Sequence, residues 1–220
     1  NVEKNEKENQ SSALEPMVKA VLVADERTPW LEEVIDGLAA QDYKKIEFLL
    51  VLKGKEKTNS DVEDLVKKAI PASKIIRTGN TASYPLLANL VLRNELTESR
   101  ENFFLFLKDD LILDATCVRR MTELAVESNA GIVGPKVLDR ENPSLLEDMG
   151  SMLDNFYSPV ERSEKGENDQ GQYDKKEISA VPESAMLIRA DLFRAIEGYD
   201  TEINSPDNNV EICLRSYLVG

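Results

Sequence analysis

Residues 103–107 form an unbroken apolar run, Phe-Phe-Leu-Phe-Leu, in which no polar residue alternates with the hydrophobic ones. Such a run is typical of a strand covered on both faces, as the strands of a parallel sheet are covered by helices. It therefore predicts the central strand of a parallel sheet, and this limits the chain to the α/β class.

Lys108, Asp109 and Asp110 follow this run directly, so two carboxylates are expected at the carboxyl end of the strand. Open α/β sheets bind their ligands at that end. Carboxylate oxygens suit a hard divalent cation, and Mg²⁺ commonly reaches a protein through one or two carboxylates plus substrate phosphates. The pair indicates a nucleotide site, although two acidic residues can also simply end a strand and begin a turn.

The rest of the chain alternates apolar runs with helical patterns, which predicts βαβ units and a mainly parallel sheet. The other expected strands are 18–24, 46–52, 74–77, 130–133, 178–181 and 185–188. The expected helices are 30–41, 83–96 and 191–197, with further helical faces over 62–69, 118–125 and 210–217.

Two segments lack this periodicity. Residues 1–16 are polar and charged, which predicts a flexible tail. Residues 141–177 are acidic and rich in Gly, Asn and Gln, which predicts a long surface loop of the kind that is usually functional or disordered. The remainder, 17–220, is expected to be a single domain. Because the sequence begins without Met and stops directly after a helical pattern, we expect it to belong to a longer polypeptide.

Composition excludes several classes of function. The net charge of -14 argues against wrapping nucleic acid and against binding an anionic membrane surface. His is absent, which excludes His-ligated zinc and Ser-His or Cys-His nucleophiles within this segment. Cys117 and Cys213 fall on apolar helix faces, as core residues in a reducing compartment would. No window approaches a membrane span and no signal peptide is recognisable, so we expect a soluble segment.

Four segments resemble the family 2 glycosyltransferases of the GT-A fold. They are AAQDYKKIEFLLV, FLFLKDDLIL, AMLIRADLFRAIEGYD and NNVEICLRSYLVG. The resemblance covers residues 17–220 and implies a GT-A-like three-layer α/β/α fold with a mainly parallel central sheet. Two further segments, SNAGIVGPKVLD and GENDQGQYD, are similar to large actinobacterial membrane-associated members, in which this domain is one part of a longer protein.

The resemblance implies transfer of a sugar from a nucleotide-diphosphate donor to an acceptor hydroxyl, with inversion at the anomeric carbon. It places this reaction in cell-envelope glycan synthesis at the cytoplasmic face of the membrane, with a glycan or lipid-linked acceptor. Any membrane contact would be made through other parts of the parent protein. The implied metal is Mg²⁺ or Mn²⁺.

The implied metal ligands are Asp110, at the last position of the family's D-x-D motif, and Asp109. The implied donor-binding residues are Asp25, Lys53, Lys108 and Asp109, and the implied acceptor-binding residues are Glu183 and Arg189. Lys108 occupies the first position of D-x-D, where an ammonium weakens a cation site by repulsion but can itself contact a diphosphate. A solvated lysine at a strand end is an equally good interpretation.

Two other positions depart from the family pattern. Residues 52–55 read Leu-Lys-Gly-Lys where the family has an acidic turn that holds the nucleobase. Asn209 stands at the position of the general base, and an amide cannot accept a proton near neutral pH. Losing a positioned base costs ~10² to 10⁴ in rate. Either Asp207 or Glu211 substitutes for it, or the domain is weak or silent; the alternative for 207–209 is a helix N-cap cluster.

Two classes of function therefore remain open. The first is an active, inverting, metal-assisted glycosyltransferase. The second is a catalytically impaired glycosyltransferase-like domain that binds a glycan, a nucleotide or a partner subunit, which the changes at Leu52, Lys108 and Asn209 favour. A nucleotidyltransferase is a weaker third alternative, because residues 24–27 lack the Gly-rich, basic loop expected after its first strand.

Overall fold

A computed structural model describes residues 15–24, 29–53, 60–78, 82–93, 102–203 and 208–219. Its central sheet has the order β3-β2-β1-β4-β10-β5, so the apolar run of β4 lies inside the sheet as predicted. The strands are β1 Val18–Ala24, β2 Ile46–Lys53, β3 Lys74–Thr78, β4 Phe103–Lys108, β5 Ile132–Val133 and β10 Ala185–Arg189.

Strand β10 runs antiparallel to both of its neighbours, whereas β3, β2, β1 and β4 are parallel to one another. Ala185 pairs with Leu107 near the end of β4, and Arg189 pairs with Phe103 at its beginning. The residues that precede β10 therefore arrive at the edge where β4 ends. This reversal brings residues 183–184 beside Lys108.

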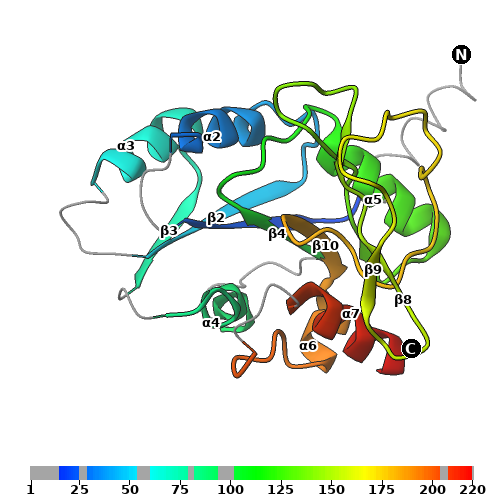
Figure 1. The fold of residues 1–220 in the computed structure, drawn as a ribbon. Coiled ribbons are helices and arrows are strands. Elements are labelled where there is room, and N and C mark those ends of the chain that lie inside the picture. The colour runs from blue at the N-terminus through cyan, green and yellow to red at the C-terminus, as the bar shows by residue number, and fades with distance from the viewer. Residues whose placement is uncertain are drawn as a thin grey trace, which may run out of the picture.

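Helices cover both faces of the sheet (Figure 1). One layer contains α2 Leu31–Ala39, α3 Ser60–Ala69 and α5 Cys117–Ser128. The other contains α4 Tyr84–Ala88, the 3₁₀ helix η1 Asn89–Leu92, α6 Ala190–Ala195 and α7 Asn208–Val219. The prediction of a three-layer α/β/α fold is confirmed. In the part of the chain that the structure describes, no helix is long and apolar enough to cross a membrane.

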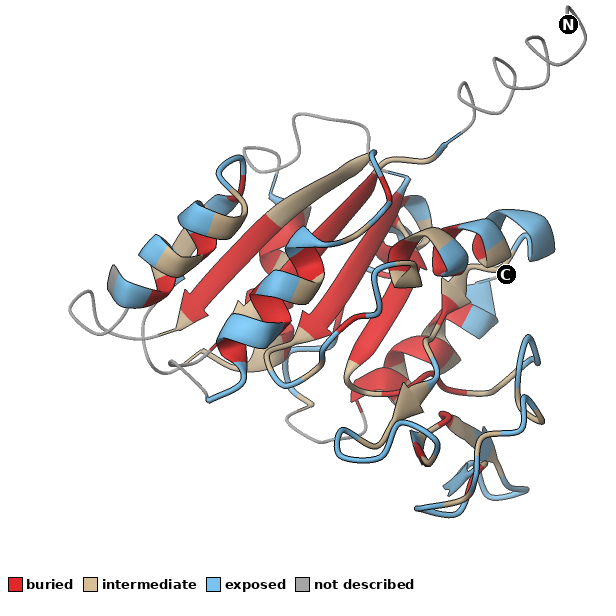
Figure 2. Ribbon diagram, turned by 90° about the horizontal axis from the view of Figure 1, so that it is seen from above, coloured by how far each residue is buried: buried red, intermediate tan, exposed pale blue. Residues whose placement is uncertain are grey.

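The two covered faces explain why β4 is apolar without alternation. Phe103, Leu105 and Leu107 belong to the core beneath α2, α3 and α5, while Phe104 and Phe106 belong to the core on the opposite face. On that second face the rings of Phe104 and Phe106 lie 5.5 Å and 4.8 Å from the ring of Phe193 in α6. Buried residues run along the central strands in Figure 2.

Two predicted elements differ from the structure. The helix expected over 83–96 breaks into α4 and η1, and Arg93 is already extended; residues 94–96 lie outside the described part of the chain. At the break, the side chain of Asn89 donates to the carbonyl of Tyr199 (2.8 Å) and accepts from its N–H (2.9 Å). The strand expected over 178–181 is reduced to one bridge between Ala180 and Ser151.

The loop predicted over 141–177 contains short strands. They are β7 Leu146–Asp148, which pairs with β6 Val137–Leu138, and the hairpin of β8 Ser151–Leu153 and β9 Pro159–Glu161. Two of its acidic groups form ion pairs: Lys136 Nζ lies 2.7 Å from Asp169 and 3.0 Å from Asp174. The hydrogen bond from Lys136 is the main cause of a lowered pKa at Asp169. We call residues 137–177 the excursion.

Substituting Phe104→Ala should lower the free energy of unfolding by about 3 to 5 kcal/mol, because this ring is fully buried against Phe106 and Phe193. Phe156→Ala is the matched control, since Phe156 is 86% exposed at the tip of the β8–β9 hairpin. Urea unfolding midpoints would measure both. Equal losses in the two variants would contradict the central position of β4.

Candidate functional site

The candidate site lies at the carboxyl edge of β2, β1 and β4. In the strand register, Val23 of β1 pairs with Val51 of β2 and with Lys108 of β4, so the three strands end side by side. Lys53, at the end of β2, is half-buried on this edge. Asp25, which follows β1, lies outside the described residues, so its predicted role in donor binding stays a prediction.

Lys108 and Glu183 form an ion pair across this edge. Lys108 Nζ lies 2.6 Å from Glu183 Oε1, and the backbone N–H of Lys108 donates to the carbonyl of Ser184 at 3.0 Å. The two side chains are 31% and 35% exposed, so both groups remain accessible to a ligand. The carboxylate offsets the ammonium charge, which weakens the repulsion that Lys108 would exert on a nearby cation.

Asp109 and Asp110 form the turn that follows β4. Asp109 is partly buried, and Asp110 is exposed. The carbonyl of Asp110 accepts a hydrogen bond of 2.7 Å from Arg140, a residue of the excursion. Two adjacent carboxylates are therefore presented at a strand end whose backbone is fixed.

The residues at this turn fit a divalent cation whose coordination a ligand completes. No group of three or more Cys, Asp or Glu side chains within the described ranges could hold a metal ion. Asp109 and Asp110 offer one or two carboxylates, which is how Mg²⁺ sites that share phosphates are usually built. The buried Oγ of Ser184, next to Glu183, has no hydrogen-bond partner and is a further polar group at this edge.

Asn209, at the position implied for the general base, is used in packing. It lies in the first turn of α7 and is 5% exposed, and its Nδ2 donates to the carbonyl of Pro182 at 2.6 Å. This bond ties α7 to the segment that carries Glu183. Asn209 thus lies inside α7, while Asp207 lies outside the described residues, so the N-cap interpretation of the cluster 207–209 stays a prediction.

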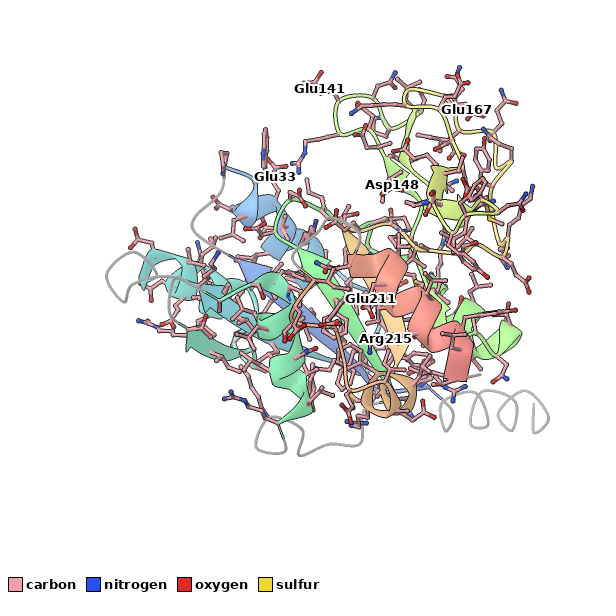
Figure 3. All side chains as sticks on the ribbon, turned by 60° about the horizontal axis from the view of Figure 1, so that its bottom comes forward. Glu33, Glu141, Asp148, Glu167, Glu211 and Arg215 are labelled. Carbon is pink, nitrogen blue, oxygen red and sulfur yellow. The ribbon has the colours of Figure 1, made fainter. Side chains whose placement is uncertain are left out.

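Glu211 is also engaged. Arg215, one turn further along α7, donates to both of its carboxylate oxygens (Figure 3). The same guanidinium donates to the carbonyls of Ile196 and Gly198 at 2.5 and 2.6 Å, so the pair fastens α7 to the end of α6. Hydrogen bonding to Glu211 raises the pKa of Arg215. A carboxylate held in this way is poorly placed to accept a proton from a substrate.

Arg189 lies at the opposite edge of the sheet. It is the last residue of β10, about 13 Å from Ala185 at ~3.3 Å per residue. Its guanidinium donates to both carboxylate oxygens of Asp191, and these bonds are the main cause of the lowered pKa of Asp191. The structure therefore does not bring Arg189 together with Glu183, and its acceptor-binding role stays a prediction that this separation disfavours.

Two tyrosines near Glu183 were not found from the sequence. Tyr84 of α4 and Tyr199 lie edge to face, with their ring centroids 5.9 Å apart. Burial raises the pKa of both phenols, and the charge of Glu183 adds to the effect. Both are therefore neutral hydrogen-bonding groups beside the site. No local sequence signal pairs them, because they come from segments far apart in the chain.

Known proteins are similar to this chain in structure rather than in sequence. No protein-family model matches the sequence, and no curated protein matches it. Solved structures do match it. S. aureus TarS is 15% identical with a TM-score of 0.65, over 92% of this chain and 33% of TarS. Mannosyltransferase PcManGT from Pyrobaculum calidifontis, in complex with GDP-Man and Mn²⁺, is 13% identical with a TM-score of 0.64, over 94% of this chain and 53% of that one. The fold is that of a glycosyltransferase. TarS 1–349 in complex with UDP also matches, at 14% identity and a TM-score of 0.62 over 92% of this chain.

The chain spans only part of these structures, from 33% of TarS to 55% of TarS 1–349. At these identities the likeness concerns the fold alone, and it assigns no role to individual residues of this chain.

Asn209→Asp should lower the free energy of unfolding by about 1 to 3 kcal/mol at neutral pH, because a carboxylate replaces the donor to the Pro182 carbonyl. Burial would raise the folded-state pKa of the introduced carboxyl, so this penalty grows as pH rises through its unfolded value of ~3.9. Urea midpoints at acidic and neutral pH would measure it. Asn155→Asp, on the exposed hairpin, is the control, and equal effects in the two variants would contradict the packing role of Asn209.

Tyr84 and Tyr199 should make the protein lose stability in alkali. Their folded-state pKa values lie above the ordinary 10.0, so their contribution is complete below pH 10.0 and is lost as pH rises from there towards the folded-state values. Tyr84→Phe should flatten this decline, whereas Tyr217→Phe, at a side chain 84% exposed, should not. Urea midpoints measured across this pH range provide the test, and identical slopes in the two variants would refute it.

Proposed function

We propose that this domain transfers a sugar from a nucleotide-diphosphate donor to an acceptor hydroxyl, with inversion at the anomeric carbon and with the assistance of Mg²⁺ or Mn²⁺. The observation that carries the proposal is the Asp109–Asp110 turn at the carboxyl end of β4, in a fold that matches a mannosyltransferase bound to GDP-Man and Mn²⁺. A nucleotide complex of TarS supports a nucleotide-sugar partner.

On the donor side, Asp109 and Asp110 would hold the cation. When bound, a divalent ion neutralises charge that develops on a departing diphosphate. Lys108, whose charge Glu183 offsets, would donate a hydrogen bond to the same phosphates. Lys53 and Asp25, at the ends of neighbouring strands, are the proposed contacts for the rest of the donor.

On the acceptor side, Glu183 would accept a hydrogen bond from the incoming hydroxyl. It is the accessible carboxylate next to the Asp109–Asp110 turn on the β10 side of the edge. Asp207, two residues before Asn209 in the sequence, is the proposed base that takes the hydroxyl proton. Glu211 is the weaker candidate, because Arg215 occupies both of its oxygens.

A second function, binding without catalysis, is favoured by the contacts of the residues at and near the position implied for the general base. Asn209 is buried and bonded to Pro182, and Glu211 is fastened to Arg215, so neither is poised for proton transfer. A domain with this arrangement could bind a nucleotide, a glycan or a partner subunit without turnover. The role in cell-envelope glycan synthesis, the glycan or lipid-linked acceptor and the location at the cytoplasmic face of the membrane stay predictions from the family resemblance.

Asp110→Ala should reduce sugar transfer about 100-fold or more, because the cation would lose a ligand and the leaving diphosphate its neutralisation. A panel of nucleotide sugars assayed with Mn²⁺ would measure the rates. Asp36→Ala, on the exposed face of α2, is the matched control and should retain full activity. Equal rates in both variants, or no transfer by the unaltered protein, would favour the binding function.

A further inference from the structure

Arg140 makes three contacts with the part of the molecule that carries the candidate site. Its Nη2 donates to the carbonyl of Asp110 at 2.7 Å, and its Nη1 lies 3.3 Å from Glu33 Oε2 in the first turn of α2. Its guanidinium carbon lies 4.3 Å from the centroid of the Trp30 ring. Glu33 and Glu141, the neighbour of Arg140, are labelled in Figure 3. One side chain of the excursion thus reaches both the turn after β4 and the start of α2.

The loop that carries Arg140 is itself ordered by hydrogen bonds. Asp139 Oδ1 accepts from the backbone N–H groups of Glu141 and Asn142 at 2.9 and 2.8 Å. Side chains of this type close turns in this way. Arg140 is therefore presented from a preformed turn, and its contacts need little further ordering.

The segment after the Asp109–Asp110 turn is fastened separately. A Cβ at Gly37 of α2 would lie 3.1 Å from the carbonyl oxygen of Leu113, so helix and segment are in close contact there. Gln41 Nε2 donates to the carbonyl of Asp114 at 2.9 Å, and Gln41 Oε1 accepts from the N–H of Val118 at 3.1 Å. These contacts hold residues 113–118 against α2, whereas the contact from Arg140 holds the peptide of Asp110.

We propose that Arg140 is a positioning residue that sets the direction of the Asp109–Asp110 carboxylates by fixing the carbonyl of Asp110. Through it, the excursion and the ligand-binding edge act as one unit. The ligand of these carboxylates would be a metal–nucleotide complex, and in this respect the inference rests on the proposed function. The fixing of the turn by Arg140 does not depend on it.

An arginine is needed for this arrangement. The planar guanidinium can stack on the Trp30 ring with its face while it donates from its edge to Asp110 and Glu33. A lysine ammonium keeps the charge but has no planar edge that donates in two directions. Arg140→Lys therefore separates positioning from charge.

Backbone NMR relaxation of the ligand-free protein tests the fixing of the turn. In Arg140→Ala and in Arg140→Lys, the order parameters of the backbone amides of residues 109–112 should fall from about 0.85, typical of rigid backbone, towards the values below about 0.6 of a flexible loop, because the turn loses its contact with the excursion. Arg162→Ala is the matched control: Arg162 also belongs to the excursion and also lies over an aromatic ring, that of Tyr173, at 5.2 Å. Unchanged order parameters in both Arg140 variants would overturn the proposal, whatever the domain binds.

Fluorescence tests the coupling to the ligand. Trp30 is the single tryptophan of the chain, so its emission reports on the Arg140 contact directly. Titration of Mn²⁺ in the presence of UDP or GDP should change this emission in the unaltered protein. Arg140→Ala lacks this reporter contact, so titration calorimetry would compare the two proteins; the variant should bind Mn²⁺ about tenfold more weakly, as expected for loss of one charge-assisted hydrogen bond.

The two experiments fail in different ways. If the unaltered protein binds neither Mn²⁺–UDP nor Mn²⁺–GDP, the proposed function fails, and the relaxation data alone decide the role of Arg140. If it binds them and Arg140→Ala binds equally well, the positioning role is overturned while the function stands. Arg140→Lys should resemble Arg140→Ala; if it instead binds like the unaltered protein, the effect is one of charge and the positioning role is wrong.

Discussion

The burial of β4 on both faces is the constraint from which the rest of the structure follows. Hydrogen bonds to β1 on one side and β10 on the other leave this strand no free edge, and two separate cores close over its side chains. The chain can leave this apolar environment only at the ends of the strand. The first polar groups after it, from Lys108 to Asp110, therefore emerge together at one place on the surface.

The reversal of β10 determines which residues meet there. Had β10 run parallel to β4, its amino end would lie at the far edge and Glu183 would not reach Lys108. The resulting ion pair changes the character of the site. An unpaired ammonium at the first position of the motif would oppose a divalent cation, whereas a neutralised one is compatible with a cation and phosphates bound close by.

Much of the fold could be predicted from the sequence, because β4, β1 and β2 are continuous apolar runs and the helices between them carry a clear period. The site was predicted less completely. Asp109, Asp110 and Lys108 adjoin a predicted strand, but the pairing of Lys108 with Glu183 depends on the direction of β10, which periodicity does not encode. The family resemblance grouped Arg189 with Glu183, although the strand between them separates them by its length. No sequence pattern indicated a role for Arg140, because its contact with Asp110 exists only in the folded chain.

The bridge between Ser151 and Ala180 gives the excursion a mechanical role. Only Val181 and Pro182 separate Ala180 from Glu183, both are buried, and the proline ring limits rotation of the backbone. The link is short, so the place of Ser151 in the hairpin constrains where the backbone of Glu183 lies. A shorter or longer excursion would therefore leave the edge of the sheet undisturbed only if Ser151 still pairs with Ala180.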